Sequence, residues 1–337
     1  MAKRTFNKAK FIIILIVGTL LGGITFIYQK LFGGKIETLP EGKFSMKQPQ
    51  DQISSDQKES KEIVAVAYAE TPAEGIREVV NRTGNLDFIK PGQKVLIKPN
   101  VNSDDPAPGT THPEALAEVI RLVKAKGAYV IVGDRSNPRW DTIPAMKTTG
   151  MYAAATEAKA DEIIGFDDQE WIRVKPDKAA SWPRGFRIPK ILTEVDHIIS
   201  VPVLHTHSIT SHSLALKNLV GLIHPTDRMI FHASPKRDDM IAEISLAVKP
   251  AMTIIDGTKS FIDGGPSKGT VSESKVYLAS SDILIAEVVG VELLKKEGAK
   301  LSWDNAWESG QVQRAMELNL GVLKKDAIEE ELKKINN

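Results

Sequence analysis

The most restrictive feature of this sequence is an alternation, from Ile63 onward, between short apolar runs and segments with helical periodicity. Such runs are typical of strands buried on both faces, and the periodic segments are typical of the helices that cover them. The alternation predicts an α/β fold with a largely parallel sheet flanked by helices, which could divide into two lobes. We expect strands at residues 63–68, 94–100, 128–134, 198–204, 252–257 and 274–280, and the clearest helices at 73–84 and 115–127. Thr111 and Glu114 have the spacing of a capping box in front of the second helix.

The amino-terminal region contains an apolar segment, residues 11–28, that carries no charged side chain. Continued to residue 32, it would be long enough as a helix to span a bilayer. Four positive charges precede it, so we expect a single-pass anchor in the cell membrane, with a cytoplasmic amino terminus and an extracytoplasmic main domain. The alternative is a signal peptide that is cleaved during export. Residues 11–32 are therefore the predicted contact with the membrane.

The remaining sequence divides by composition into three parts. Residues 33–62 are polar and lack apolar periodicity, which indicates a flexible linker. Residues 63–323 form the predicted α/β domain. Residues 324–337 are rich in charge and predict a solvated helical tail.

Composition excludes several classes of function. The chain has no cysteine, which rules out disulfides, thiolate catalysis and cysteine-ligated zinc or iron–sulfur clusters. The net charge is +1 and the first ten residues hold four cations, so the rest of the chain is slightly acidic. We therefore expect no nucleic-acid partner. The oligomeric state is left open by these observations.

Four of the predicted strands end in polar residues that can take part in chemistry. They end with Lys98 and Asn100, with Asp134, with His205 and His207, and with Asp256. Ligands of open parallel sheets bind beyond the carboxyl ends of the strands. If the four strands are parallel neighbours, these residues share one edge of the sheet, which we call the rim.

Histidines are concentrated near this rim, because five of the seven lie between His205 and His232. His205 and His207 are two residues apart and face the same way in an extended chain. With His212 and Asp256, they could ligate a divalent transition metal, or they could bind an anion. His207 is also a candidate for acid–base catalysis.

A lysine and an asparagine, Lys217 and Asn218, interrupt the apolar run that follows the histidines. Desolvation would lower the pKa of Lys217 and make it a base or a covalent anchor. The alternative is a lysine at a helix end whose ammonium reaches solvent. We expect Lys217, His207 and Asp134 to be catalytic, and Lys98, Asn100 and Asn218 to bind a small anionic ligand or cofactor.

These motifs occur in an order that resembles the family known as domain of unknown function 362. The similar segments are K-P-N (98–100), T-H-P (111–113), G-D (133–134), V-P-x-L-x-T-H (201–207), S-L-A-L-K-N-L-V-G-L-I (213–223), D-G (256–257) and G-G-P-x-x-G (264–269). The resemblance covers about residues 63–298. It implies a class rather than an activity. Many relatives carry an iron–sulfur segment, but without cysteine none is expected here. Where the family often has a lysine and an aspartate, this sequence has His205 and Glu287.

The sequence leaves the activity open. The first hypothesis is a membrane-tethered enzyme that depends on a metal or an anionic cofactor and acts as a hydrolase, isomerase or transferase. The second is a non-catalytic envelope module that binds a small anion or metal. The third is a structural envelope protein whose histidines serve packing.

Overall fold

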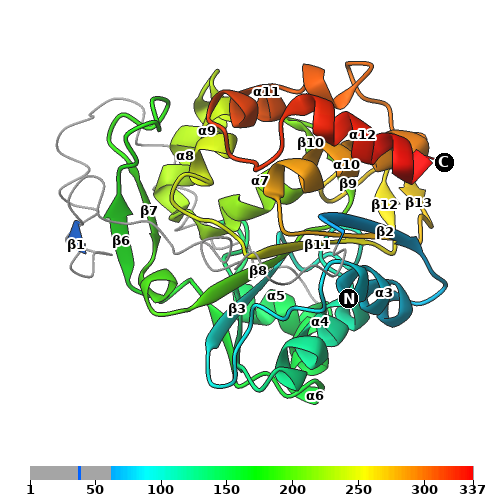
Figure 1. Cartoon of the computed structure of the whole chain (residues 1–337). Helices are drawn as coiled ribbons and strands as arrows, with labels where there is room; N and C mark the ends of the chain where they lie inside the picture. Colours follow the sequence, from blue (N-terminus) through cyan, green and yellow to red (C-terminus); the bar gives the residue numbers. More distant parts are fainter. Residues whose placement is uncertain (1–36, 39–61, 337) are drawn as a thin grey trace, which may run out of the picture. The chain divides into compact units, whose positions relative to one another are not determined.

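The computed structural model describes residues 37–38 and 62–336 (Figure 1). The predicted membrane anchor and most of the linker lie outside these residues. No helix within the described ranges is both long and apolar enough to cross a membrane. The chain divides into the units 1–37 and 38–337, and the description below concerns the second unit. The short strand β1 (Glu37–Thr38) stands at the boundary.

A seven-stranded sheet forms the centre of the second unit, as the alternating sequence predicts. Antiparallel pairing joins β14 to both of its neighbours, and the other pairings are parallel. Of these seven strands, β14 alone therefore runs against the rest. The strand order is β2 (Val64–Tyr68), β14 (Val276–Ser280), β11 (Met252–Gly257), β8 (His197–Val201), β3 (Lys94–Pro99), β4 (Tyr129–Asp134) and β5 (Glu162–Gly165).

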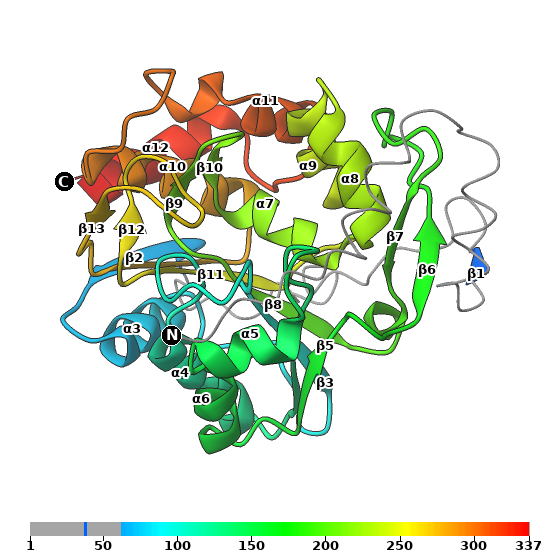
Figure 2. The same ribbon diagram turned by 180° about the vertical axis from the view of Figure 1, so that it is seen from behind.

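Helices cover both faces of the sheet (Figures 1 and 2). Alternate strand residues enter two separate cores, as Leu96 and its neighbours Val95 and Ile97 illustrate. One face carries α3 (Pro72–Arg82), α4 (Pro113–Ala125), α5 (Thr142–Thr148) and α6 (Met151–Glu157). The other carries α7 (Ala215–Asn218), α8 (Pro225–Ala233), α9 (Arg237–Ile244), α10 (Ile283–Lys296), α11 (Gly310–Glu317) and α12 (Lys325–Asn336).

Short ribbons and 3-10 segments complete the unit. The ribbons pair antiparallel, and one of them, β9 with β10, carries three of the clustered histidines. The ribbon strands are β6 (Trp171–Val174), β7 (Phe186–Pro189), β9 (His205–His207), β10 (Ser211–Ser213), β12 (Ser260–Phe261) and β13 (Val271–Ser272). The 3-10 segments are η3 (Lys190–Thr193), η4 (Leu219–Leu222) and η5 (Ala306–Glu308).

The start of α4 differs from the predicted capping box. His112 is the N-cap, and its Nδ1 accepts from the backbone N–H of Glu114 at 3.2 Å. The Thr111 hydroxyl instead donates to the carbonyl of Val201 at 2.8 Å and accepts from the N–H of Asn100. Thr111 therefore joins the ends of β3 and β8. The capping prediction was wrong by one residue, because the Thr111 hydroxyl binds the carbonyl of Val201, which is distant in sequence, and does not cap the helix.

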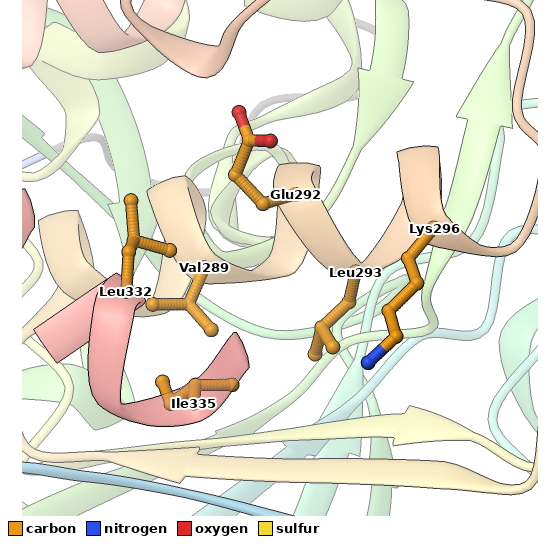
Figure 3. Close-up of a pocket in the computed structure, with 6 residues that line it drawn as sticks. All are labelled: Val289, Glu292, Leu293, Lys296, Leu332 and Ile335. Carbon is orange, nitrogen blue, oxygen red and sulfur yellow. The ribbon is translucent and has the colours of Figure 1, made fainter. Parts of the chain in front are cut away.

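The charge content of residues 324–337 suggested a solvated helix. The carboxyl-terminal helix α12 instead packs one of its faces against the core. Ile328 is fully buried, and Leu332 and Ile335 pack against the core. Figure 3 shows Leu332 and Ile335 facing Val289 and Leu293 of α10 around a small pocket. The tail therefore covers one face of α10. Its charged side chains occupy the remaining faces of an amphipathic helix.

Candidate functional site

The rim predicted from the sequence exists. Strands β11, β8, β3 and β4 are consecutive and parallel, so their carboxyl ends meet at one edge. Lys98, Asp134 and Asp256 lie at that edge and are buried. The structure nevertheless gives these three residues partners within the protein.

Lys98 and Asp134 form a buried ion pair, with 2.8 Å between Nζ and Oδ1. The same ammonium donates to the carbonyl of Pro99 at 2.8 Å and to Oδ1 of Asn218 at 3.2 Å. Three protein oxygens therefore lie within contact of the ammonium, two as hydrogen-bond acceptors and Asp134 Oδ1 as the ion-pair partner. Burial lowers the pKa of Lys98, and the Asp134 carboxylate opposes that change. Lys98 is thus buried and already contacts an internal carboxylate, a carbonyl and an amide oxygen.

The other predicted rim residues extend this internal network. Asn218 donates from Nδ2 to the Ser200 hydroxyl at 2.9 Å, and Asp134 Oδ2 accepts from the N–H of Val101 at 2.8 Å. Asn100 is half-buried, and its described contact is the backbone bond to Thr111. The network joins β3, β4, β8 and α7.

Gly221, in η4, packs directly against the ion pair of Lys98 and Asp134. A Cβ at this position would lie 2.1 Å from Asp134 Oδ1 and 2.6 Å from Lys98 Nζ. Only the absence of a side chain lets η4 pack directly on the ion pair.

The carboxylate of Asp256 binds backbone and hydroxyl donors. Its Oδ2 accepts from the N–H of His112 at 2.7 Å, and its Oδ1 accepts from the N–H and the hydroxyl of Thr258 at 3.0 and 2.6 Å. Asp256 therefore fixes the amino end of α4 to the end of β11.

The histidines lie beyond the rim, in the β9–β10 hairpin, because strand β8 already ends at Val201. Thr206 pairs with His212, whereas His205 and His207 pair with Ser213 and Ser211. Directly paired residues share a face of a ribbon, and adjacent residues do not. His205 and His207 therefore share one face, as predicted, and His212 lies on the other.

The hydrogen bonds of His205 and His207 define where each ring carries its proton. His205 Nδ1 lies 2.7 Å from the Thr206 carbonyl and must donate, which leaves Nε2 as a buried acceptor without a partner among the described residues. His207 Nδ1 accepts from the N–H of Ile209 at 3.1 Å, so its Nε2 is the donor. Burial, together with the charge of Lys217, lowers the pKa of His205 to about 4 and lowers that of His207 further. Both imidazoles are neutral at pH 7.

His212 contacts a buried carboxylate on α10. Its Nε2 lies 2.7 Å from Glu287 Oε1, and Glu287 Oε2 accepts from the N–H of Leu216 at 2.8 Å. The ring also packs edge-on against Trp303. His212 Nδ1 is buried and has no partner in the described part of the chain.

Lys217 extends from α7 toward the same hairpin. Burial lowers the pKa of its amine to about 7, and the nearby charge of Arg228 acts in the same direction. Its charge also interacts with those of Asp238 and Glu287. Within residues 62–336 the half-buried Lys217 has no hydrogen bond and no ion pair. It is therefore the cation at this site that remains available to a ligand.

The remaining clustered histidines have local roles. His224 caps α8, because its Nδ1 accepts from the N–H of Thr226 at 3.2 Å. His232 is exposed, and its Nδ1 lies 2.7 Å from the carbonyl of Arg228. The functional cluster is thus smaller than the count of five histidines suggests.

The predicted metal ligands are not brought together as one set. Asp256 binds the start of α4, and His212 lies on the opposite ribbon face from His205 and His207. Across the ranges that the structure describes, no three His, Asp or Glu side chains are arranged to hold a metal ion.

Three residues of the site region were not predicted. Asp238 lies in the first turn of α9 and Gln311 at the start of α11, so only the tertiary fold brings them to the hairpin. Arg228 is buried and donates to the carbonyls of Ile223, Ser136, Arg135 and Gly221. Burial lowers the pKa of its guanidinium to about 9. Arg228 follows Thr226 and Asp227 in the polar first turn of α8, so no local sequence signal marked it either.

The fold and the rim define a class: an α/β protein with a largely parallel sheet and a His–Lys cluster beyond the carboxyl ends of its strands. The sequence pattern of the family described as domain of unknown function (DUF362) matches residues 95–292, more than half of the chain, and the chain belongs to this family. It is also similar to a thylakoid-associated protein of Synechocystis sp. The two are 26% identical over 235 residues, which cover 67% of this chain and 71% of that protein.

Proposed function

We propose that this chain is a membrane-attached enzyme whose site, centred on Lys217 and His207, binds a small anion and performs acid–base chemistry on it. The observation that carries the proposal is the Lys217 amine, which has no partner within the described residues and lies among neutral imidazoles. A group that titrates near neutral pH can both bind an anion and transfer a proton. His207 Nε2–H adds a neutral donor beside it.

The location forms part of the proposal. The apolar segment 11–32 with its basic flank supports a single membrane anchor, and the related Synechocystis protein carries the name thylakoid-associated. With the amino terminus in the cytoplasm, the α/β domain would lie on the opposite side of the membrane. Protease protection in sealed vesicles tests this orientation. Cleavage of the domain from the cytoplasmic side only would contradict it.

The ligand site is tested with the full-length chain in detergent. Calorimetry with acetate and with inorganic phosphate should show binding to the wild type and none to Lys217→Met. The matched control is Lys90→Met, which removes an exposed lysine that precedes β3, at the opposite edge of the sheet. Equal binding by wild type and Lys217→Met would contradict the assignment.

Catalysis is tested by nuclear magnetic resonance of candidate carboxylates and phosphate esters in deuterium oxide. The spectra report bond cleavage, isomerisation and hydrogen exchange together. We expect one of these changes with the wild type and none with Lys217→Met. Binding without any turnover would favour the second candidate, a non-catalytic anion-binding module. The ion pair between Lys98 and Asp134 supports this candidate, because it occupies two of the predicted site residues within the protein.

A divalent transition metal at His205 and His207 remains the second candidate for a cofactor. The free Nε2 lone pair of His205 supports it, because neutral imidazole is a good metal ligand. His207 could join only by losing the proton on Nε2, since its Nδ1 accepts from the N–H of Ile209. Metal content measured by mass spectrometry should then fall in a His205→Ala plus His207→Ala variant. Unchanged content would exclude these two residues as ligands.

A further inference from the structure

Three buried acceptor atoms belong to His212, on the ribbon face opposite His205 and His207, and to two side chains near the hairpin. They are Asp238 Oδ1, His212 Nδ1 and Gln311 Oε1, and none has a donor within the part of the chain that the structure describes. His212 is 1% exposed and Gln311 is fully buried. Leaving such groups unpaired in a protein interior is costly.

Other contacts fix each acceptor in its role. Gln311 Nε2 donates to the Thr210 carbonyl at 3.2 Å, so the amide oxygen must be the free end. His212 directs Nε2 toward the Glu287 carboxylate, so in the neutral ring Nδ1 is the lone pair. Asp238 contributes a carboxylate oxygen.

These acceptors are neighbours. Asp238 interacts electrostatically with His212 and Lys217. A Cβ at Gly310, the residue before Gln311, would lie 2.9 Å from Asp238 Oδ2. The Thr210 hydroxyl donates to the carbonyl of His212, which joins the Gln311 contact to the hairpin. Asp238 and Gln311 therefore lie near residues 210–212 of the hairpin, which include His212.

The two sides of the site differ in character. Lys217 and the Nε2–H of His207 are donors, and Lys217 supplies the positive charge. The opposite side supplies three acceptors and the negative charge of Asp238. Lys217 and Asp238 interact through space, yet they do not form an ion pair with each other.

We propose that the ligand is a small zwitterion, with an anionic group held by Lys217 and a primary ammonium held by Asp238, His212 and Gln311. A primary ammonium has three N–H groups, which matches three acceptors. Its charge compensates that of the half-buried Asp238 carboxylate. Free amino acids and O-phosphoethanolamine both have this chemistry. The inference rests on the proposed anion site at Lys217 and adds a cationic subsite to it.

The test compares matched probes by calorimetry on the full-length chain in detergent. Each protein amino acid is paired with the carboxylic acid that lacks its amino group, as glycine is with acetate, and O-phosphoethanolamine is paired with ethyl phosphate. For at least one pair, we expect the ammonium-bearing probe to bind the wild type at least tenfold more tightly. The preferred pair shows whether the anionic group is a carboxylate or a phosphate.

Variants locate the cationic subsite. Asp238→Asn should abolish the preference for the ammonium, whereas the simple anion should still bind below pH 7, where Lys217 is charged. Gln311→Leu should weaken the preference without a change of charge. Asp239→Asn is the matched control, because it removes the neighbouring carboxylate on the same helix and should preserve the preference.

The outcomes separate this inference from the proposed function. Equal binding of both members of every pair to the wild type would overturn the zwitterion and leave the anion site at Lys217. A preference that survives in Asp238→Asn would also overturn it. Binding of neither member of any pair would overturn both proposals.

Discussion

His212 Nε2 lies 2.7 Å from Glu287 Oε1, and both side chains are buried. This contact fastens the β9–β10 hairpin to α10. Glu287 also accepts from the N–H of Leu216, so a single carboxylate satisfies a side chain on the hairpin and the backbone of α7.

Glu287→Gln should change the position of the proton on His212. The glutamine side chain has one oxygen and one NH2 group. If the oxygen accepts from the N–H of Leu216, the NH2 group faces Nε2 of His212. Nε2 must then be an acceptor, so the proton of the neutral ring moves to Nδ1. Nitrogen-15 spectra of histidine-labelled protein should show this tautomer, with a stability loss of about 1–3 kcal/mol. Glu317→Gln, at an exposed position, is the control and should change neither property. An unchanged His212 tautomer would refute the prediction.

Asp134→Asn should destabilise the fold strongly because it leaves the buried Lys98 ammonium without its counter-charge. Removing one partner of a buried ion pair costs about 3–5 kcal/mol. Denaturant unfolding measures the change. The paired replacement Lys98→Met plus Asp134→Leu should recover part of the loss, since no charge then remains buried.

The exposed pair of Lys259 and Glu273 provides the comparison for this experiment. Lys259→Met should cost no more than about 1 kcal/mol, because solvent screens surface pairs. If Asp134→Asn were as mild as this control, the buried pair would not support the fold as we infer.

Gly221→Ala should also destabilise the fold, although it adds only one methyl group. The new Cβ would fall 2.1 Å from Asp134 Oδ1, within an ion pair that has no room to move. Overpacking of this kind costs about 1–3 kcal/mol. Thermal unfolding is the measurement, and an unchanged midpoint would contradict the close packing of η4 on the rim.

Anion binding should weaken as the pH rises above about 7. The Lys217 pKa is lowered to about 7, so the amine is charged below this pH and neutral above it. Affinity should then approach a tenfold loss per pH unit, as expected for the loss of one proton. Lys217→Arg should retain binding at higher pH, because arginine stays charged. The same pH profile in both proteins would exclude Lys217 as the titrating group.

Lys217 should also make stability depend on pH. Between about 7 and the ordinary lysine pKa of 10.5, the unfolded chain holds a proton that the folded chain has lost. Folding stability therefore rises with pH in this window and falls as the pH drops toward 7. Lys217→Met should remove that rise from melting curves recorded between pH 7 and 10. A persistent rise in the variant would assign it to another group.

The sheet could be predicted from the sequence because its strands are continuous apolar runs. The predicted segments at 94–100, 128–134 and 252–257 match β3, β4 and β11 to within one residue at either end. The helical segments between them indicated parallel strands, but the shared rim was predicted only on the condition that these strands are neighbours, which the strand order shows. Lys98, Asp134 and Asp256 were correctly placed at that edge.

The partners of those residues could not be predicted, because they are separated by long stretches of sequence. Nothing local indicates that Lys98 meets Asn218, or that Asp256 binds the N–H of His112. The hairpin was also missed, since its turn at residues 208–210 contains no glycine, and the positive φ of 63° falls on Ser211. That turn places His212 on the opposite face from His205.

The pairing of β2 with β14 affects how the chain is made. The first strand of the domain lies at an edge of the sheet and is hydrogen-bonded to a strand near the end of the domain. During synthesis, β2 must wait without a partner until β14 has emerged, so this sheet is completed late. A chain that ends before Val276 lacks β14, so the edges of β2 and β11 that pair with it are left unpaired. Unpaired strand edges promote aggregation. Premature termination before the codon for Val276 should therefore produce insoluble protein rather than a shortened active form.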